Sequence, residues 1–404
     1  MNKASFLVWK YRFYPDRVDI VRNFFFEKCT SVSTLNVECA AITSNILLMP
    51  FKRCNLTIIT PSNNYTLLGI PTDYARSLCE RFTDSGNEEK RFQITTRDLL
   101  KKSVLQSRMK WYFLILAALW ATVLIFGGKY ISAETANALS RLAFRRSVLF
   151  GTFVMSLALP QVIIWIWALT GGVLYEFIRY YRYTATRTRD VICFEYGIIT
   201  YRKVYIPVKR IAVCEYVQSP LMQICRCGRV SIFAVGYNSY FMKSDTILPF
   251  VTTSRASVIT RELLPEFEVK YEKESKAPFR FFLIYWTSLI PIIFLILSFF
   301  YGYGWAILAL ITSVILLADY SVHRSNSRVI CQNGITYASR GGFFHKVTLI
   351  RNERLESCSS YGSVMKKRKG YVNFCFRVFG RRHKAIRVRN IPADTASHYS
   401  IPER

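Results

Sequence analysis

The sequence predicts a multi-pass α-helical membrane protein that carries three β-rich blocks on one side of the bilayer. Four stretches of the 404-residue chain are almost free of charge, and their lengths approach or exceed the roughly 20 residues that cross ~30 Å of hydrocarbon. The remaining sequence is polar, basic and strand-like, and the formal net charge is +29. Because the stretches come in pairs, all three blocks are expected on the same side.

The first block, residues 1–95, alternates short β-branched runs with polar turns. Gly69-Ile70-Pro71 closes a strand, and Asp73–Phe82 then has the composition of a short helix. Proline at the entry to a Thr/Asp-rich turn is typical of a helix start. We therefore predict several strands followed by one helix.

Residues 96–178 are interpreted as a linker and a first transmembrane hairpin. Its predicted spans are residues 111–128 and 148–175. The second span has 28 residues, or ~42 Å at ~1.5 Å per residue, so it is expected to tilt or to kink at Pro160.

The second block, residues 179–279, begins with Val191-Ile192-Cys193, a turn at Gly197 and a second β-branched run. Two such runs joined at a glycine are typical of a hairpin, because glycine supplies the positive φ that tight turns need. The block ends on Leu248-Pro249 and a helix-compatible run over Ser254–Leu264.

A second hairpin is predicted over residues 280–320, with spans 281–300 and 305–319. Residues 301–304 (Tyr-Gly-Tyr-Gly) contain the Gly-Tyr-Gly of a potassium filter. A filter needs a re-entrant loop between two helices, and four residues are too few to form one. We interpret the segment as the turn of the hairpin.

The third block, residues 321–404, repeats the landmarks of the second. Val329-Ile330-Cys331 leads into Gly334, and Ile391-Pro392 closes the last strand. We therefore predict superposable folds for residues 183–265 and 323–398. The net charge of residues 323–404 is +13, against +7 for residues 178–279 and +3 for the first block.

The distribution of Lys and Arg predicts orientation. Fifteen of them lie within 15 residues of the predicted spans on the side of the blocks, and four lie in the two hairpins. Positive charge accumulates on the cytoplasmic side. The blocks and both termini are therefore expected in the cytoplasm, at the plasma membrane.

Three segments of the second block carry a family resemblance: Tyr205-Ile206-Pro207-Val208-Lys209-Arg210-Ile211, then Gln218-Ser219-Pro220-Leu221, then Gly228-Arg229-Val230-Ser231-Ile232. With them the chain resembles the bacterial pleckstrin-homology (bPH) membrane-flanked domain family of the YdbS/YdbT-like type. The resemblance implies that each block is a PH-like β-barrel or bent sheet closed by a C-terminal helix, and it implies a role in envelope integrity. Longer members carry another span pair first, which leaves open whether the native chain starts upstream of Met1.

A basic run is the strongest candidate for a binding site. Lys366, Lys367, Arg368 and Lys369 are expected at a hairpin tip that enters the strand from Tyr371, and the next turn holds Arg381, Arg382 and Lys384. Antiparallel pairing would place these two clusters at opposite ends of that strand. Anionic lipid headgroups are the expected ligand. A solvated loop without a ligand is the alternative.

No motif points to catalysis, to a metal or to another cofactor. The eleven cysteines are irregularly spaced, which favours reduced thiols, and Cys225-Arg226-Cys227 lacks the second ligand pair of a zinc site. The chain is thus interpreted as a non-catalytic membrane-anchored scaffold whose blocks bind anionic lipid or a protein partner. An oligomeric transporter or channel subunit is the alternative. A homo-oligomer and a membrane protein partner both stay open, and nucleic acid is not expected.

Overall fold

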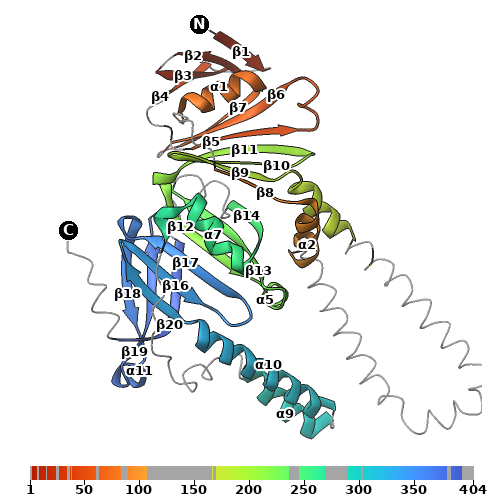
Figure 1. Ribbon diagram of the computed structural model, residues 1–404, viewed down its shortest axis with the longest axis vertical. Helices are drawn as coiled ribbons and strands as arrows, with labels where there is room; N and C mark the ends of the chain where they lie inside the picture. Colours follow the sequence, from red (N-terminus) through yellow and green to blue (C-terminus); the bar gives the residue numbers. More distant parts are fainter. Residues whose placement is uncertain are drawn as a thin grey trace, which may run out of the picture. The chain divides into compact units, whose positions relative to one another are not determined.

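Strands dominate the described part of the chain in the computed structural model shown in Figure 1. Contacts divide the chain into one compact unit of residues 1–99, 178–284 and 318–404 and another of residues 100–177 and 285–317. The structure describes residues 2–6, 9–14, 16–23, 27–33, 37, 39–60, 63–82, 90–106, 166, 170–235, 245–268, 289–301, 304–379 and 384–393.

The first block forms two antiparallel sheets and a helix. Strands β1 to β4 follow one another in the first sheet, β5 to β7 belong to the second, and α1 comes directly after β7. Asp73 lies in the first turn of α1, where a carboxylate favours the helix N-terminus. The elements are β1 (Asn2–Phe6), β2 (Trp9–Phe13), β3 (Arg17–Asn23), β4 (Glu27–Ser33), β5 (Cys39–Asn45), β6 (Arg53–Ile59), β7 (Asn64–Pro71) and α1 (Thr72–Phe82).

The second block has the same order of strands and a closing helix. Its first strand, β8, lies within residues 1–95 but pairs with β9. The elements are β8 (Lys90–Gln93), β9 (Thr184–Thr188), β10 (Val191–Tyr196), β11 (Thr200–Pro207), η2 (Val208–Arg210), β12 (Ile211–Gln218), α5 (Pro220–Ile224), β13 (Cys227–Ala234), β14 (Asp245–Thr252), α7 (Thr253–Leu263) and η3 (Pro265–Phe267).

From β9 onward, the third block follows the second strand for strand, as the sequence repeat predicted. Its elements are β15 (Arg328–Gln332), β16 (Ile335–Arg340), β17 (His345–Arg351), η5 (Asn352–Arg354), β18 (Leu355–Tyr361), α11 (Val364–Arg368), β19 (Tyr371–Val378) and β20 (Lys384–Pro392). Three of these strands, β15, β16 and β19, begin and end 144 positions after β9, β10 and β13. The several strands predicted for each block are therefore present, while the residues after Ala393, where the closing helix of the third block is expected, lie outside the described residues.

The landmarks at the start of the two blocks, however, are one strand out of step, whereas Leu248-Pro249 and Ile391-Pro392 lie in the counterpart strands β14 and β20. Val191-Ile192-Cys193 opens β10, whereas Val329-Ile330-Cys331 lies in β15, the counterpart of β9. The counterpart of Gly197 is Gly341 and not Gly334, because both adopt φ near +100° and both face the carbonyl oxygen three residues ahead. Alternation with a period of two is the same in every strand, so it cannot identify which strand a short motif occupies.

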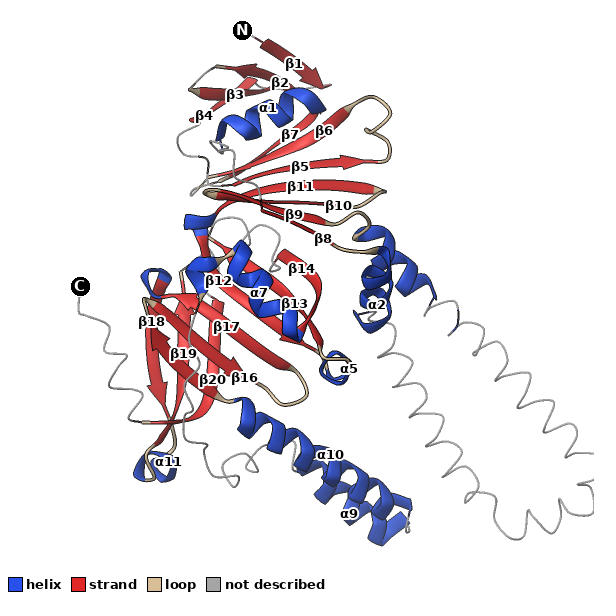
Figure 2. Cartoon of the chain, viewed as in Figure 1, coloured by secondary structure: helices blue, strands red, loops and turns tan. Residues whose placement is uncertain are grey.

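Neighbouring blocks share sheets, which Figure 2 shows as two continuous fans of strands. A seven-stranded sheet has the order β7-β6-β5-β11-β10-β9-β8, and a six-stranded sheet has the order β14-β13-β12-β17-β16-β15. In the seven-stranded sheet, β5 of the first block pairs with β11 of the second. In the six-stranded sheet, β12 of the second block pairs with β17 of the third. The sheets β1-β2-β3-β4 and β18-β19-β20 form the two ends of this series.

The buried cores cross the same boundaries. The cluster around Leu56 and Leu67 of the first block includes Tyr205 of the second. The cluster around Phe374 and Phe376 of the third block includes Val213 of the second. Each block therefore contributes apolar side chains to its neighbour's core and is not an independent hydrophobic unit.

The predicted fold class, a multi-pass α-helical membrane protein, is wrong for the described residues. They are mainly strands, and none of their helices is long and apolar enough to cross a membrane. Helix α9 (Leu289–Tyr301) spans 13 residues, or about 20 Å. Helix α10 (Gly304–Asn326) ends in a polar stretch that contains Asp319 and Arg324. The predicted span 111–128 and most of span 148–175 lie outside the described residues, as do residues 281–288 of the third.

Candidate functional site

The basic run predicted from the sequence forms a short helix at a hairpin tip. Helix α11 joins β18 to β19 and carries Lys366, Lys367 and Arg368, with Lys369 as its C-cap. Gly370 follows with φ +71°, and its N–H donates to the Lys367 carbonyl oxygen at 3.0 Å. Glycine adopts this left-handed conformation without strain, so the chain can turn directly into β19.

The cations of this tip do not all face solvent. Lys366 is half-buried, and its Nζ donates to Asn390 Oδ1 at 2.7 Å. Burial lowers the pKa of Lys366, and the nearby Arg389 guanidinium lowers it further. Lys367, Arg368 and Lys369 are exposed. Three of the four predicted cations are thus presented at the surface, while Lys366 fixes the tip to β20.

The second predicted cluster lies elsewhere. Arg381 and Arg382 fall outside the described residues. Lys384 begins β20 and pairs with Val378, whereas Tyr371, next to the tip, pairs with Pro392. Seven residue steps of β19 separate these pairs, or roughly 23 Å. The structure therefore does not bring Lys384 to α11, in agreement with the expected placement at opposite ends of the strand.

The same hairpin connection recurs in every block. We call these connections tip 1 (residues 46–52), tip 2 (residues 220–226) and tip 3 (residues 364–370). Each ends on a residue with positive φ, at Lys52, Arg226 and Gly370, and these positions are 174 and 144 residues apart. The tips are therefore equivalent parts of one repeated unit.

All three tips expose apolar side chains. Leu47 in tip 1 and Ile224 in tip 2 are each 78% exposed, and Val364 in tip 3 is 67% exposed. Ile46 and Phe51 add to the apolar surface of tip 1. Sequence reasoning found only the charge of tip 3. The signal it missed was the apolar run Ile-Leu-Leu-Met-Pro-Phe over residues 46–51, placed between two strands where a polar turn is usual.

Tip 2 is fixed to a neighbouring loop of the third block. The Gln223 side-chain amide donates to the carbonyl oxygens of Gly342 and Phe343 at 3.2 Å and 2.6 Å. Phe344, next along this loop, is 54% exposed. The loop is anchored in turn by Asp319, whose Oδ1 accepts from the Phe343 N–H at 2.6 Å. The apolar surface of tip 2 is therefore held on an ordered support.

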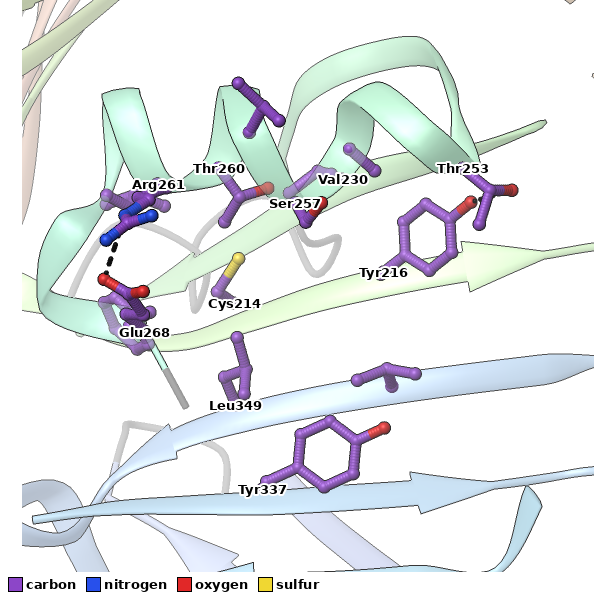
Figure 3. Close-up of a pocket in the computed structure, with 15 residues that line it drawn as sticks. Cys214, Tyr216, Val230, Thr253, Ser257, Thr260, Arg261, Glu268, Tyr337 and Leu349 are labelled. Atoms are coloured by element: carbon purple, nitrogen blue, oxygen red, sulfur yellow. Dashed lines mark hydrogen bonds and ion pairs between the residues drawn. The ribbon is translucent and has the colours of Figure 1, made fainter. Parts of the chain in front are cut away.

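A cavity of about 320 Å³ lies under helix α7, over strands β12, β13, β16 and β17. Figure 3 shows Cys214 and Leu349 pointing into it from the sheet. Its polar contacts join lining residues to each other, Tyr216 Oη to Thr253 Oγ1 at 3.1 Å and Arg261 to Glu268 at 3.1 Å. The cavity therefore offers a ligand mainly apolar contacts. The two charged side chains that line it, Arg261 and Glu268, pair with each other.

No cysteine among the described residues is in a disulfide bond. Burial raises the pKa of Cys54 to about 11 and raises that of Cys79 further. Such thiols stay protonated and are poor nucleophiles. Among the described residues, no three His, Cys, Asp or Glu side chains gather as metal ligands would.

A profile of the bacterial PH domain family matches residues 113–267. Comparisons with curated proteins and with solved structures gave no match. The finer YdbS/YdbT-like type is not confirmed by the match and stays a prediction. The matched range includes β9 to β14, tip 2 and α7. The other two blocks repeat the order of these strands. Over residues 113–267, this chain is therefore similar to the bacterial PH domain family.

Proposed function

We propose that the chain is a non-catalytic array of PH-like units that binds anionic lipid headgroups through its tips, with tip 3 as the principal basic contact. The observation that supports this most directly is the recurrence of exposed apolar side chains in all three tips, joined in tip 3 by exposed cations. Apolar side chains can enter the acyl boundary of a bilayer while Lys and Arg contact its phosphates.

The charge distribution favours lipid over a neutral partner. The third block carries 17 basic and four acidic residues, and each cation near an anionic leaflet contributes about 1 kcal/mol. The plasma-membrane location and the role in envelope integrity stay predictions. The transporter or channel alternative depended on the predicted spans and receives no support from the helices that the structure describes.

The test is co-sedimentation of the full chain with vesicles of phosphatidylglycerol or of phosphatidylcholine. The full chain is needed, because β17 of the third block pairs with β12 of the second. Replacing Lys367, Arg368 and Lys369 with Glu removes at least about 3 kcal/mol of attraction, which corresponds to roughly 100-fold weaker binding. Binding of the unchanged protein should also weaken between 0.1 M and 1 M salt, as the Debye length falls from about 10 Å to about 3 Å.

A matched control makes the same change in net charge outside the tips. Arg76 on α1, Lys209 on η2 and Arg255 on α7 are exposed, and their replacement with Glu should leave most of the binding intact. Equal loss in both variants would show that overall charge, and not tip 3, attracts the protein to lipid. Equal binding to both vesicle types by the unchanged protein would contradict the proposal itself.

A further inference from the structure

The blocks are joined by one repeated strand pairing. Strand β11 pairs with β5, and β17 pairs with β12, both antiparallel. In chain order, β11 and β17 close the first sheet of their block, and β5 and β12 open the second sheet of the preceding block. The pairing therefore always joins the same two edges of the unit.

The register of this pairing is the same at both junctions. Thr43 lies opposite Arg202 in the first, and Val217 lies opposite Lys346 in the second. Val217 is 174 positions after Thr43, and Lys346 is 144 positions after Arg202, which are the spacings of the tips. An identical register at two junctions indicates an intrinsic preference of the two edges for each other.

At each end of the series, one strand of this type has no strand on its outer side among the described residues. Strand β4 is the counterpart of β11 and β17. Arg22 of β3 pairs with Lys28 of β4, and the residues 174 positions later, Tyr196 of β10 and Arg202 of β11, also pair with each other. Strand β18 is the counterpart of β12 at a spacing of 144. Both strands lie at the outer edge of their sheets, and among the described residues no further strand pairs with either.

The outer edge of β18 has few of the devices that prevent strand addition. Charged side chains, above all Lys, and Pro blunt an edge, and β18 (Leu-Glu-Ser-Cys-Ser-Ser-Tyr) contains only one of them, Glu356. The opposite edge of the same sheet, β20, carries Arg387, Arg389 and Pro392. The irregularity at Glu356 does not mark an edge, because β12 has one at the equivalent Ala212.

We propose that β18 of one copy pairs with β4 of a second copy, antiparallel and in the register of the two internal junctions. The two copies would then continue the series of shared sheets. Because the two edges differ, the contact is head-to-tail, and repeated use of it builds a ring or an open chain. Extending the internal register predicts the pairs Ser357 with Val32, Cys358 with Ser31, Ser359 with Thr30, Ser360 with Cys29, and Tyr361 with Lys28.

The pair formed by Ser360 and Cys29 makes the register testable with a native thiol, since both residues are exposed. The test uses the full chain with Cys225 replaced by Ser to remove the other exposed cysteine. Ser360→Cys should give disulfide-linked oligomers on mild oxidation, with the peptides around residues 360 and 29 joined. Ser359→Cys points to the opposite face of the strand and should crosslink at least about tenfold less, because only residues on one face approach to disulfide distance.

Two tagged chains of different size separate this pairing from a symmetric one. One chain carries Ser360→Cys with Cys29→Ser, and the other keeps Cys29 and Ser360. The proposal predicts crosslinks only between unlike chains, and crosslinks between two copies of the first chain would overturn it in favour of β18 pairing with itself. A mass measurement provides an independent check: Ser360→Lys with Cys29→Lys should yield monomers, and Ser360→Glu with Cys29→Lys should restore oligomers. An unmodified protein that is monomeric in this assay would also overturn the proposal.

Discussion

Replacement of Gly341 by Ala tests the conformation on which the repeated hairpin depends. Gly341 joins β16 to β17 with φ +98°, and an added Cβ would lie 2.1 Å from the Phe344 carbonyl oxygen. Its counterpart Gly197 has φ +99°, with the Thr200 carbonyl oxygen at 2.3 Å. Gly334 is the matched control, because its φ is +73° and nothing lies within 4 Å of an added Cβ.

The expected cost follows from these two differences. A non-glycine residue in left-handed backbone loses about 1–2 kcal/mol, and this term is common to all three positions. At Gly341 and Gly197 the backbone carbonyl must also move, and a strained backbone residue costs up to about 3 kcal/mol. We therefore expect about 1 kcal/mol for Gly334→Ala and about 2–4 kcal/mol for Gly341→Ala.

Thermal unfolding of the full chain, followed by circular dichroism, measures this difference. One kcal/mol corresponds to roughly 2–4 °C for domains of this size range. Gly341→Ala should therefore lower Tm by about 4–16 °C and Gly334→Ala by only about 2–4 °C. Equal shifts for the two variants would refute the assignment of Gly341 as the counterpart of Gly197.

Two further perturbations concern ion pairs. Lys102 Nζ contacts Glu176 Oε2 at 2.9 Å, and the Lys102 side chain is 1% exposed. Because Lys102→Met leaves the Glu176 carboxylate without this partner, it should lower the free energy of unfolding by about 3 kcal/mol. Denaturant titrations should show that adding Glu176→Gln recovers part of this loss. Burial raises the pKa of Glu266, but its hydrogen bond and ion pair with Arg187 lower it more, to a net value below 4.5. The ionised Glu266 side chain therefore contributes to the free energy of unfolding above pH 4.5, and this contribution is lost as pH falls through the pKa of the folded state. The difference in stability between wild type and Glu266→Gln should disappear in acid and stay constant near neutral pH.

The sequence predicted the local elements of the blocks better than their connections. Strand-like alternation and the Pro71 helix start correspond to β strands and α1, since both depend on neighbouring residues. The pairing of β5 with β11 was not predicted, because backbone hydrogen bonds between distant segments leave no residue pattern that one sequence reveals. The register irregularities at the equivalent positions Asn55, Arg229 and Asn373 were not predicted either.

The candidate site was predicted only in part. A run of four cations is visible in any sequence, and α11 presents three of them. The apolar run over residues 46–51 was a signal for tip 1 that was missed. Nothing in the sequence marked the exposure of Ile224, because an apolar side chain next to a strand is usually buried. The fold class was wrong because runs of apolar residues were interpreted as membrane spans, whereas strands are the main element of the described residues and none of the described helices could cross a membrane.

The most direct test of the account is whether the equivalent tips enter a bilayer together. Tryptophan is placed at Leu47, Ile224 or Val364, and the fluorescence gained over the unchanged chain, which already has seven tryptophans, is compared in phosphatidylglycerol vesicles with and without brominated acyl chains. Val258 on α7, which is 53% exposed and outside the tips, is the matched control. If the tips enter the bilayer, bromine should quench the added fluorescence at all three tip positions and not at residue 258. Absence of quenching at the tips, or equal quenching at residue 258, would contradict the account.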